Sequence, residues 1–133
     1  MKKIFKNQIA LALAGILAGT SAVAGTLVIN GDTSDPAPKA AFQAVIDGFE
    51  AENPDVDVVY NLFDHEGYKA AIRNFLSADA PDIAFWYAGN RMAPFVEAGL
   101  FAPIDDVWAD QGLYSLMASS APGMTMDGQK WGI

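Results

Sequence analysis

Two large aromatic residues, Trp86 and Tyr87, close an apolar run that is typical of a β-strand. An acidic and a hydroxyl residue, Asp32 and Thr33, follow an earlier short apolar run in the same way. In an open parallel α/β sheet, ligands bind in the crevice outside the carboxyl ends of the strands. Carboxylate and hydroxyl groups bind sugar hydroxyls, and an aromatic ring covers the apolar face of a pyranose. The pattern predicts a recognition site for a sugar-like ligand, with Asp32 and Trp86 as the leading candidates.

Each of these candidates also has a structural interpretation. Trp86 or Tyr87 could cap the hydrophobic core, because large aromatic side chains are usually mostly buried. Asp32 could close an Asx-turn after its strand, since Asp side chains commonly hydrogen-bond the backbone two residues on. The residue types fit both interpretations, and both stay open at this point.

Two further pairs of polar residues fall beside the same predicted edge. Asp64 and His65 end the second apolar run on the flank of the crevice, where a solvated loop is the alternative. Asn90 and Arg91 open a predicted helix, whose first amides either receive an acceptor group or are simply capped. Three consecutive side chains rarely converge on one ion, and zinc sites use separated ligands. We therefore expect no metal at residues 64–66.

The groups that an enzyme needs are not visible in the sequence. The chain has no cysteine and one histidine, and it lacks a G-x-S-x-G elbow and a phosphate-cradling glycine loop. The carboxylate pairs Asp55/Asp57 and Asp105/Asp106 look like solvated ends of elements, without a partner for general acid-base chemistry. We expect neither catalytic residues nor a cofactor.

The spacing of apolar residues predicts the elements that hold the candidates. Runs at 26–30, 56–63 and 82–86 predict three strands. Amphipathic stretches predict three helices: one from an Asp35 cap to Glu52, one from residue 68 to about 77, and one over 90–98 that stops at Gly99. Three strands separated by two helices of this length form right-handed parallel crossovers, so the predicted class is α/β.

The stretch after Gly99 predicts smaller elements. Val107 and Trp108 look like packing anchors of a connection, and residues 113–120 form a predicted short helix. Residues 124–133 predict a β-hairpin, because Asp127 and Gly128 supply the positive φ angles of a type I′ turn.

Residues 1–24 have the pattern of an export signal. A basic start precedes an apolar stretch over residues 9–20, and Ala22-Val23-Ala24 fits the A-x-A cleavage pattern, so cleavage is expected after Ala24. The apolar stretch is shorter than the roughly 18 residues of a membrane span. Without cysteine, the chain has neither a disulfide nor a lipid-bearing cysteine. A periplasmic location follows.

Charge narrows the range of partners. All 16 acidic residues follow Gly31, and three of the 8 basic residues precede the expected cleavage point, so residues 25–133 carry 5 basic and 16 acidic residues and a net charge of −11. Such a field repels nucleic acid and anionic lipid surfaces. Nucleic acid is therefore not an expected partner. The length after cleavage suits one small domain and is too short for two lobes.

Four motifs stand in an order that resembles a known family: Pro81-Asp82-Ile83, Trp86-Tyr87, Glu97-Ala98-Gly99-Leu100 and Pro103-Ile104-Asp105-Asp106. The chain from Gly25 to Ile133 resembles the extracellular solute-binding proteins of ABC importers, particularly their carbohydrate-binding branch. The resemblance implies a periplasmic-binding-protein type II-like fold, in which strand one lies between strands two and three. Family members continue past such a hairpin into a hinge and a second lobe.

The resemblance implies a function in transport. The protein would capture a sugar or oligosaccharide in the periplasm and deliver it to an inner-membrane ABC permease, as a monomer when full length. Residues 25–133 would be an amino-terminal fragment, an incomplete first lobe. The alternatives are a truncated secreted α/β enzyme acting on glycans and a small stand-alone interaction domain.

Overall fold

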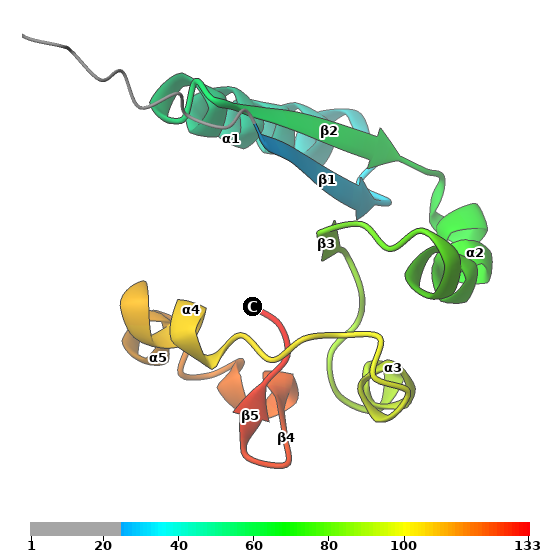
Figure 1. Ribbon diagram of the computed structural model, residues 1–133, viewed down its shortest axis with the longest axis vertical. Helices are drawn as coiled ribbons and strands as arrows, with labels where there is room; N and C mark the ends of the chain where they lie inside the picture. Colours follow the sequence, from blue (N-terminus) through cyan, green and yellow to red (C-terminus); the bar gives the residue numbers. More distant parts are fainter. Residues whose placement is uncertain (1–24) are drawn as a thin grey trace, which may run out of the picture.

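A parallel three-stranded sheet organises the amino-terminal half of the protein. The computed structural model describes residues 25–133, and in it β1 (Gly25–Gly31) lies between β2 (Val56–Leu62) and β3 (Ile83–Ala84) (Figure 1). Both neighbours run parallel to β1, which confirms the predicted strand order. Because the strands point the same way, their carboxyl ends meet at one edge of the sheet.

The third strand is shorter than predicted because a side chain replaces part of its backbone pairing. Asp82 stands just before β3, and its Oδ2 accepts a hydrogen bond from the Val28 amide at 2.8 Å. The Phe85 amide then donates to the Asn30 carbonyl at 3.0 Å, and the regular ladder ends. The chain that carries Trp86 and Tyr87 is therefore free to turn away from the sheet.

Helix α1 (Pro36–Glu52) has nearly the predicted bounds. Its two prolines lie at its start, where amides have no intrahelical partner in any case. Asp35 stands at the N-cap position, but within residues 25–133 its side chain makes no capping hydrogen bond, so the expected cap is wrong. The helix ends at Asn53, whose backbone amide and side-chain amide both donate to the Phe49 carbonyl.

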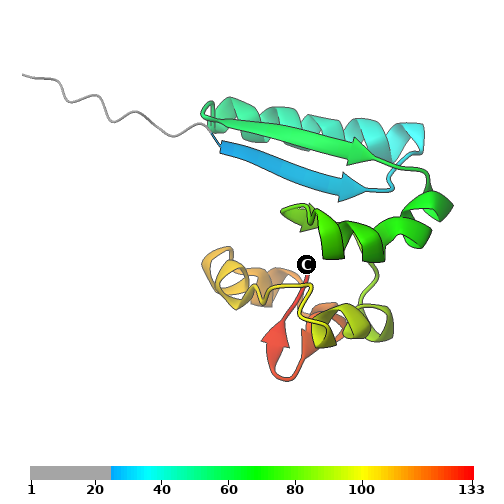
Figure 2. The same cartoon turned by 45° about the vertical axis from the view of Figure 1, so that its right-hand side comes forward.

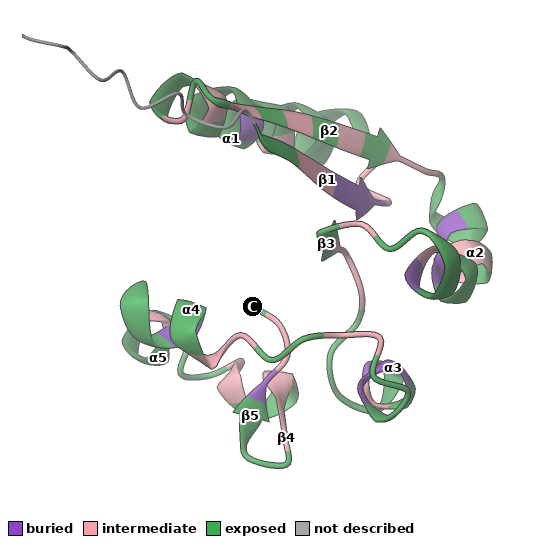
Figure 3. Ribbon diagram, viewed as in Figure 1, coloured by how far each residue is buried: buried purple, intermediate pink, exposed green. Residues whose placement is uncertain are grey.

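The apolar stripe of α1, formed by Phe42, Val45, Ile46 and Phe49, is only partly covered by the sheet. Ile46 is buried, and Phe42 lies 4.9 Å from the ring of Tyr60. Val45 and Phe49 are 64% and 39% exposed. A sheet of three strands, one of them two residues long, is too narrow to cover a full stripe, and most of α1 is exposed in Figure 3.

Helix α2 (His65–Ala78) begins earlier than predicted because Asp64 is its N-cap. The Oδ1 atom of Asp64 accepts a hydrogen bond from the Gly67 amide at 2.8 Å. Residues 64–67 are therefore a cap and a first helical turn, and the solvated-loop interpretation is wrong. The buried face of α2 forms the main core with one residue of a later helix; its members are Tyr68, Ile72, Leu76 and Phe95.

The predicted helix over 90–98 is two shorter elements. A 3-10 turn, η1 (Gly89–Arg91), precedes α3 (Ala93–Glu97). Pro94 has no amide hydrogen to continue a helix that started earlier, so regular α-helix begins only around the proline. Gly99 ends the helix with a φ of 67°, as predicted.

The remaining elements form a group beyond β3, an edge strand of the sheet (Figure 2). Helix α4 (Asp105–Asp110) was not expected, and α5 (Leu113–Leu116) is shorter than predicted. After the 3-10 turn η2 (Ala121–Met124), a hairpin forms from β4 (Thr125–Met126) and β5 (Gln129–Lys130).

The hairpin has the predicted turn and packs against α4. Asp127 and Gly128 have φ angles of 52° and 80°, which confirms the predicted turn. Lys130 is buried, and its ammonium lies 5.2 Å from the ring centre of the fully buried Trp108. Asp105 accepts a hydrogen bond from the Lys130 amide, so it ties α4 to the hairpin and is not merely a solvated end.

Among the helices of residues 25–133, none is long and apolar enough to cross a membrane. The expected export signal and its cleavage point lie outside the described residues.

Gly31→Ala should destabilise the fold, because the chain that leads to Asp32 passes close to two rings. A Cβ at Gly31 would lie 3.0 Å from Tyr60 Cε2 and 3.1 Å from Phe85 Cδ2. Both rings pack on Phe42 and have little room to move. We expect a loss of about 1–3 kcal/mol in the free energy of unfolding, measured by urea denaturation.

Gly48→Ala is the matched control, since no described atom lies within 4 Å of a Cβ at this helical position. It should stabilise the chain by about 0.4–1 kcal/mol. Equal stability of the Gly31→Ala variant and the original chain would contradict the close packing at this strand end.

Candidate ligand-binding site at the strand ends

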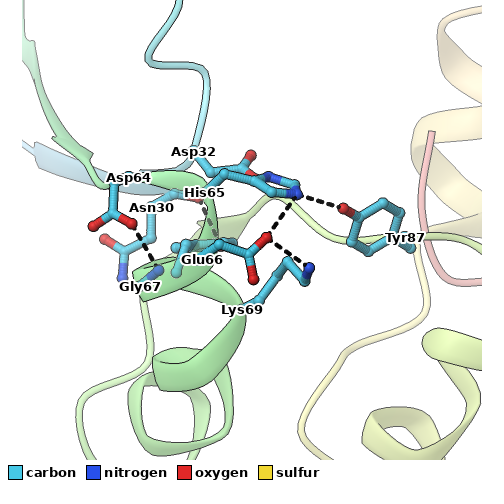
Figure 4. A network of polar contacts seen from close by, with 9 residues as sticks. Asn30, Asp32, Asp64, His65, Glu66, Gly67, Lys69 and Tyr87 are labelled. Atoms are coloured by element: carbon cyan, nitrogen blue, oxygen red, sulfur yellow. Dashed lines mark hydrogen bonds and ion pairs between the residues drawn. The ribbon is translucent and has the colours of Figure 1, made fainter.

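A chain of side-chain contacts joins the loops that follow the three strands (Figure 4). Asp32 follows β1, His65 begins α2 after β2, and Tyr87 follows β3. His65 Nδ1 lies 2.6 Å from Asp32 Oδ2, and His65 Nε2 lies 3.1 Å from the Tyr87 hydroxyl. Residues that are 33 and 22 positions apart in the sequence therefore form one polar network.

The network rests on a buried anchor that sequence reasoning missed. Asn30, the neighbour of Gly31 in β1, is 5% exposed. Its carbonyl accepts a hydrogen bond from the Tyr68 hydroxyl, and its side-chain oxygen accepts one from Asn61 Nδ2. Because Tyr68 lies one turn after His65, this anchor fixes α2 against the end of β1. A polar residue closing the apolar run at 26–30 was the available signal.

Solvent reaches the network. The side chain of His65 is 50% exposed and that of Asp32 is 23% exposed. Tyr87 is 37% exposed. The groups are thus held by one another and remain open to a ligand.

Arg91 covers one face of the Tyr87 ring. Its guanidinium carbon lies 4.3 Å from the ring centre, within cation–π range. The rings of His65 and Trp86 make T-shaped contacts with the Tyr87 ring. Since these three neighbours pack around the ring, the hydroxyl is the part of Tyr87 best placed to meet a ligand.

Trp86 packs against the core in the way that its structural interpretation predicts. Its ring lies 5.4 Å from Phe95 in a T-shaped contact, and it is half-buried. Its Nε1 donates a hydrogen bond to the Arg91 carbonyl at 2.8 Å. The indole N–H therefore holds the turn at Arg91 in place, and only the exposed part of the ring can meet a ligand.

The other predicted residues lie around this network. Thr33 is half-buried beside Asp32, and Asn90 is exposed in η1. Asp64 uses Oδ1 for the cap of α2. A single 3-10 turn offers no helix N-terminus for an acceptor, which removes the amide role considered for Asn90 and Arg91.

Two pKa values depart from the ordinary range. A hydrogen bond from Lys69 Nζ, 3.0 Å from Glu66 Oε1, is the main cause that lowers the pKa of Glu66. Burial, and next the charge of Asp32, raise the pKa of the Tyr68 phenol. Within the described part of the chain, no group of three His, Asp or Glu side chains is placed to hold a metal ion.

An open groove of about 380 Å³ lies at the opposite end of the sheet. Glu50, Asp55 and Asp57 line it, together with the start of β1. It faces the amino ends of the strands, whereas ligands of open parallel sheets bind at the carboxyl ends. The strand-end network is therefore the better candidate site.

The fold is an α/β domain with a solvent-exposed polar network at its strand ends. Residues 33–122 match the family of bacterial extracellular solute-binding proteins, and the chain belongs to this family. A comparison with curated proteins gave no match.

Solved structures agree with this assignment. The bacterial solute receptor AcbH, which has an exclusive preference for β-D-galactopyranose, is 30% identical, with a TM-score of 0.69 over 80% of this chain and 27% of its own. A protein studied for xylan utilization by Caldanaerobius polysaccharolyticus is 31% identical, with a TM-score of 0.74 over 81% of this chain and 28% of its own. The GacH receptor of Streptomyces glaucescens, solved with acarbose, is 28% identical, with a TM-score of 0.58 over 82% and 28%.

These structures confirm the predicted fold class and family. This chain spans 27–28% of the length of each of the three. The alternative of a secreted glycan enzyme gains no support from the proteins that match.

Alkaline pH should destabilise the protein through Tyr68. In the unfolded chain this phenol ionises near its ordinary pKa of about 10, while burial keeps it protonated in the native state. Above a pH of about 10, the native state therefore binds more protons than the unfolded chain. The free energy of unfolding then falls as the pH rises, by up to about 1.4 kcal/mol per pH unit.

Tyr68→Phe removes the dependence of stability on pH that comes from this phenol. It also removes the hydrogen bond to the Asn30 carbonyl, which costs about 0.5–1.5 kcal/mol in the free energy of unfolding. This second loss does not depend on pH below the phenol pKa. Urea denaturation from about pH 8 to about pH 11 measures how steeply the free energy of unfolding falls with pH in the original chain and in the Tyr68→Phe variant. Equal slopes would show that the Tyr68 phenol ionises normally in the folded chain.

Proposed function

We propose that this chain is part of the substrate-binding component of an ABC import system, which captures a sugar or oligosaccharide in the periplasm and delivers it to the inner-membrane permease. Membership of the solute-binding family supports the role in capture. The preference of AcbH for β-D-galactopyranose and the binding of acarbose by GacH support a carbohydrate ligand.

The contact chain from Asp32 through His65 to Tyr87 is the observation that carries this proposal. It joins three loops at the carboxyl edge of a parallel sheet, which is where such sheets bind ligands. A carboxylate and a phenol hydroxyl, held at the two nitrogens of one imidazole and open to solvent, match the hydroxyl groups of a sugar. Arg91 adds a guanidinium with several donors.

The eight candidate residues take different parts in this proposal. Asp32, His65, Tyr87 and Arg91 form the wall that meets the ligand. Thr33, Asn90 and the exposed part of Trp86 lie at its rim, and Asp64 contributes by capping α2. The chemistry is recognition alone: a ligand that binds the closed state more tightly shifts the population toward that state.

Export and assembly complete the proposal. Cleavage after Ala24 would release residues 25–133 as the start of the first lobe, and the full-length protein would act as a monomer. Amino-terminal sequencing of the secreted protein tests the cleavage point, with Gly25 expected first.

A thermal-shift screen of the full-length protein tests the ligand class. The panel contains D-galactose, xylo-oligosaccharides and maltose, with polyamines and amino acids as comparison ligands. We expect neutral sugars to raise the melting temperature, because a ligand that binds only the native state stabilises it. Shifts from polyamines or amino acids alone would show that the carbohydrate assignment is wrong.

Asp32→Ala tests the site itself. Removing a hydrogen bond to a charged group costs about 1.5–3 kcal/mol, which is about 10- to 150-fold in affinity. Calorimetric titration of the full-length protein with the sugar that gives the largest shift measures this loss. Asp110→Ala, at the exposed end of α4, makes the same change of charge away from the site and should bind normally. Equal affinities for both variants would place the ligand elsewhere.

A further inference from the structure

The contacts of His65 decide which atoms in the network donate hydrogen bonds. The carboxylate of Asp32 only accepts, so His65 Nδ1, 2.6 Å away, carries the hydrogen. The second nitrogen, Nε2, faces the Tyr87 hydroxyl at 3.1 Å. A hydroxyl both donates and accepts, so the state of Nε2 sets the direction of this second bond.

Two states of the ring satisfy the Asp32 contact. In the neutral Nδ1–H tautomer, Nε2 accepts a hydrogen bond from Tyr87. In the imidazolium, Nε2 donates to Tyr87, and a ligand would then meet the phenol hydrogen.

Among residues 25–133, Nε2 has no carboxylate within hydrogen-bond distance. Glu66 is the other carboxylate near the ring, but its Oε1 is 3.9 Å from Nε2, beyond hydrogen-bond distance. Glu66 instead accepts from Lys69 at 3.0 Å, and its side chain is 79% exposed. The guanidinium of Arg91, a positive charge, lies over the Tyr87 ring. The Tyr87 phenol is thus the group that hydrogen-bonds Nε2, and in the neutral tautomer it supplies the hydrogen.

We propose that His65, held as its Nδ1–H tautomer by Asp32, is a positioning residue that presents Tyr87 to the ligand as a hydrogen-bond acceptor. Asp32, at the other nitrogen of the ring, keeps its second oxygen, Oδ1, as another acceptor. This wall of the site therefore selects a neutral ligand whose hydroxyl groups donate hydrogen bonds to Tyr87 and Asp32. It discriminates against analogues that can only accept a hydrogen bond at these positions. The inference rests on the proposed function for the ligand, while the tautomer itself belongs to the ligand-free protein.

Nitrogen-15 NMR of the tag-free, ligand-free protein near neutral pH tests the tautomer. His65 is the single histidine of these 133 residues, and the loss of its signals in the His65→Leu variant assigns them in the full-length protein. We expect Nδ1 to resonate as a protonated nitrogen and Nε2 as an unprotonated one. Two protonated nitrogens, or a proton on Nε2 alone, would overturn the inference and leave the proposed function standing.

Tyr87→Phe is the matched variant for this spectrum, because it removes the donor to Nε2 and keeps the ring. The loss of a hydrogen bond should move the Nε2 signal and leave Nδ1 nearly unchanged. An unchanged Nε2 signal would show that Tyr87 does not donate to His65.

Sugar analogues test the direction of recognition. Monodeoxy and monodeoxyfluoro forms of D-galactose and D-xylose are titrated into the full-length protein, since fluorine accepts weakly and cannot donate. At the hydroxyl that meets Tyr87, we expect the fluoro form to bind as poorly as the deoxy form, with about a 5- to 10-fold loss for one neutral hydrogen bond. Full affinity of every fluoro form would overturn the inference.

His65→Leu completes the test. It frees the Tyr87 hydroxyl to rotate, so the fluoro form should regain affinity relative to the deoxy form, an effect that a purely structural histidine would not produce. If the unmodified protein shows the Nδ1–H tautomer but binds no member of the sugar panel, the proposed function fails and the hydrogen-bond direction at Tyr87 still stands.

Discussion

The parallel pairing of β1 with both of its neighbours is the constraint on which the candidate site depends. It places the ends of three strands at one edge, so the segments that carry Asp32, His65 and Tyr87 lie together. A slip of one residue in either ladder would turn alternate side chains to the opposite face. Asn30 resists such a slip, because its carbonyl and side chain are both bonded to neighbouring elements.

Above this edge, the polar side chains hold one another in place before any ligand arrives. Asp32 orients His65, His65 bonds to Tyr87, and Arg91 stacks on the Tyr87 ring. Groups that are already fixed lose little conformational entropy when they bind, which favours affinity. An exposed site built from short, mutually bonded side chains can therefore recognise a ligand without deep burial.

Much of this arrangement could be predicted from the sequence. Apolar runs with intervening amphipathic helices are local signals, and they predicted the three strands and the α/β class, whereas the order of the strands was implied by the resemblance to the solute-binding family. The hairpin turn was predictable because Asp127-Gly128 has a specific backbone requirement. The grouping of Asp32, His65 and Tyr87 near one edge followed from the rule for parallel sheets.

The rest depends on contacts between distant residues, which local periodicity does not encode. The cap at Asp64 lengthened α2, and Pro94 divided the predicted third helix. Trp86 was expected mainly as a ligand platform, but its N–H bonds the Arg91 carbonyl and its ring packs on Phe95. The role of Asn30 became visible only when Tyr68 was found to lie against it.

The central claim is that a neutral sugar binds where these three strands end, and the ring signals of His65 report on that place directly. The most direct measurement is a titration of the full-length protein with a binding sugar, monitored in parallel by calorimetry and by the His65 ring resonances. The account predicts that the His65 signals shift and saturate with the same dissociation constant as the heat. Saturating heat with unmoved His65 signals would contradict it.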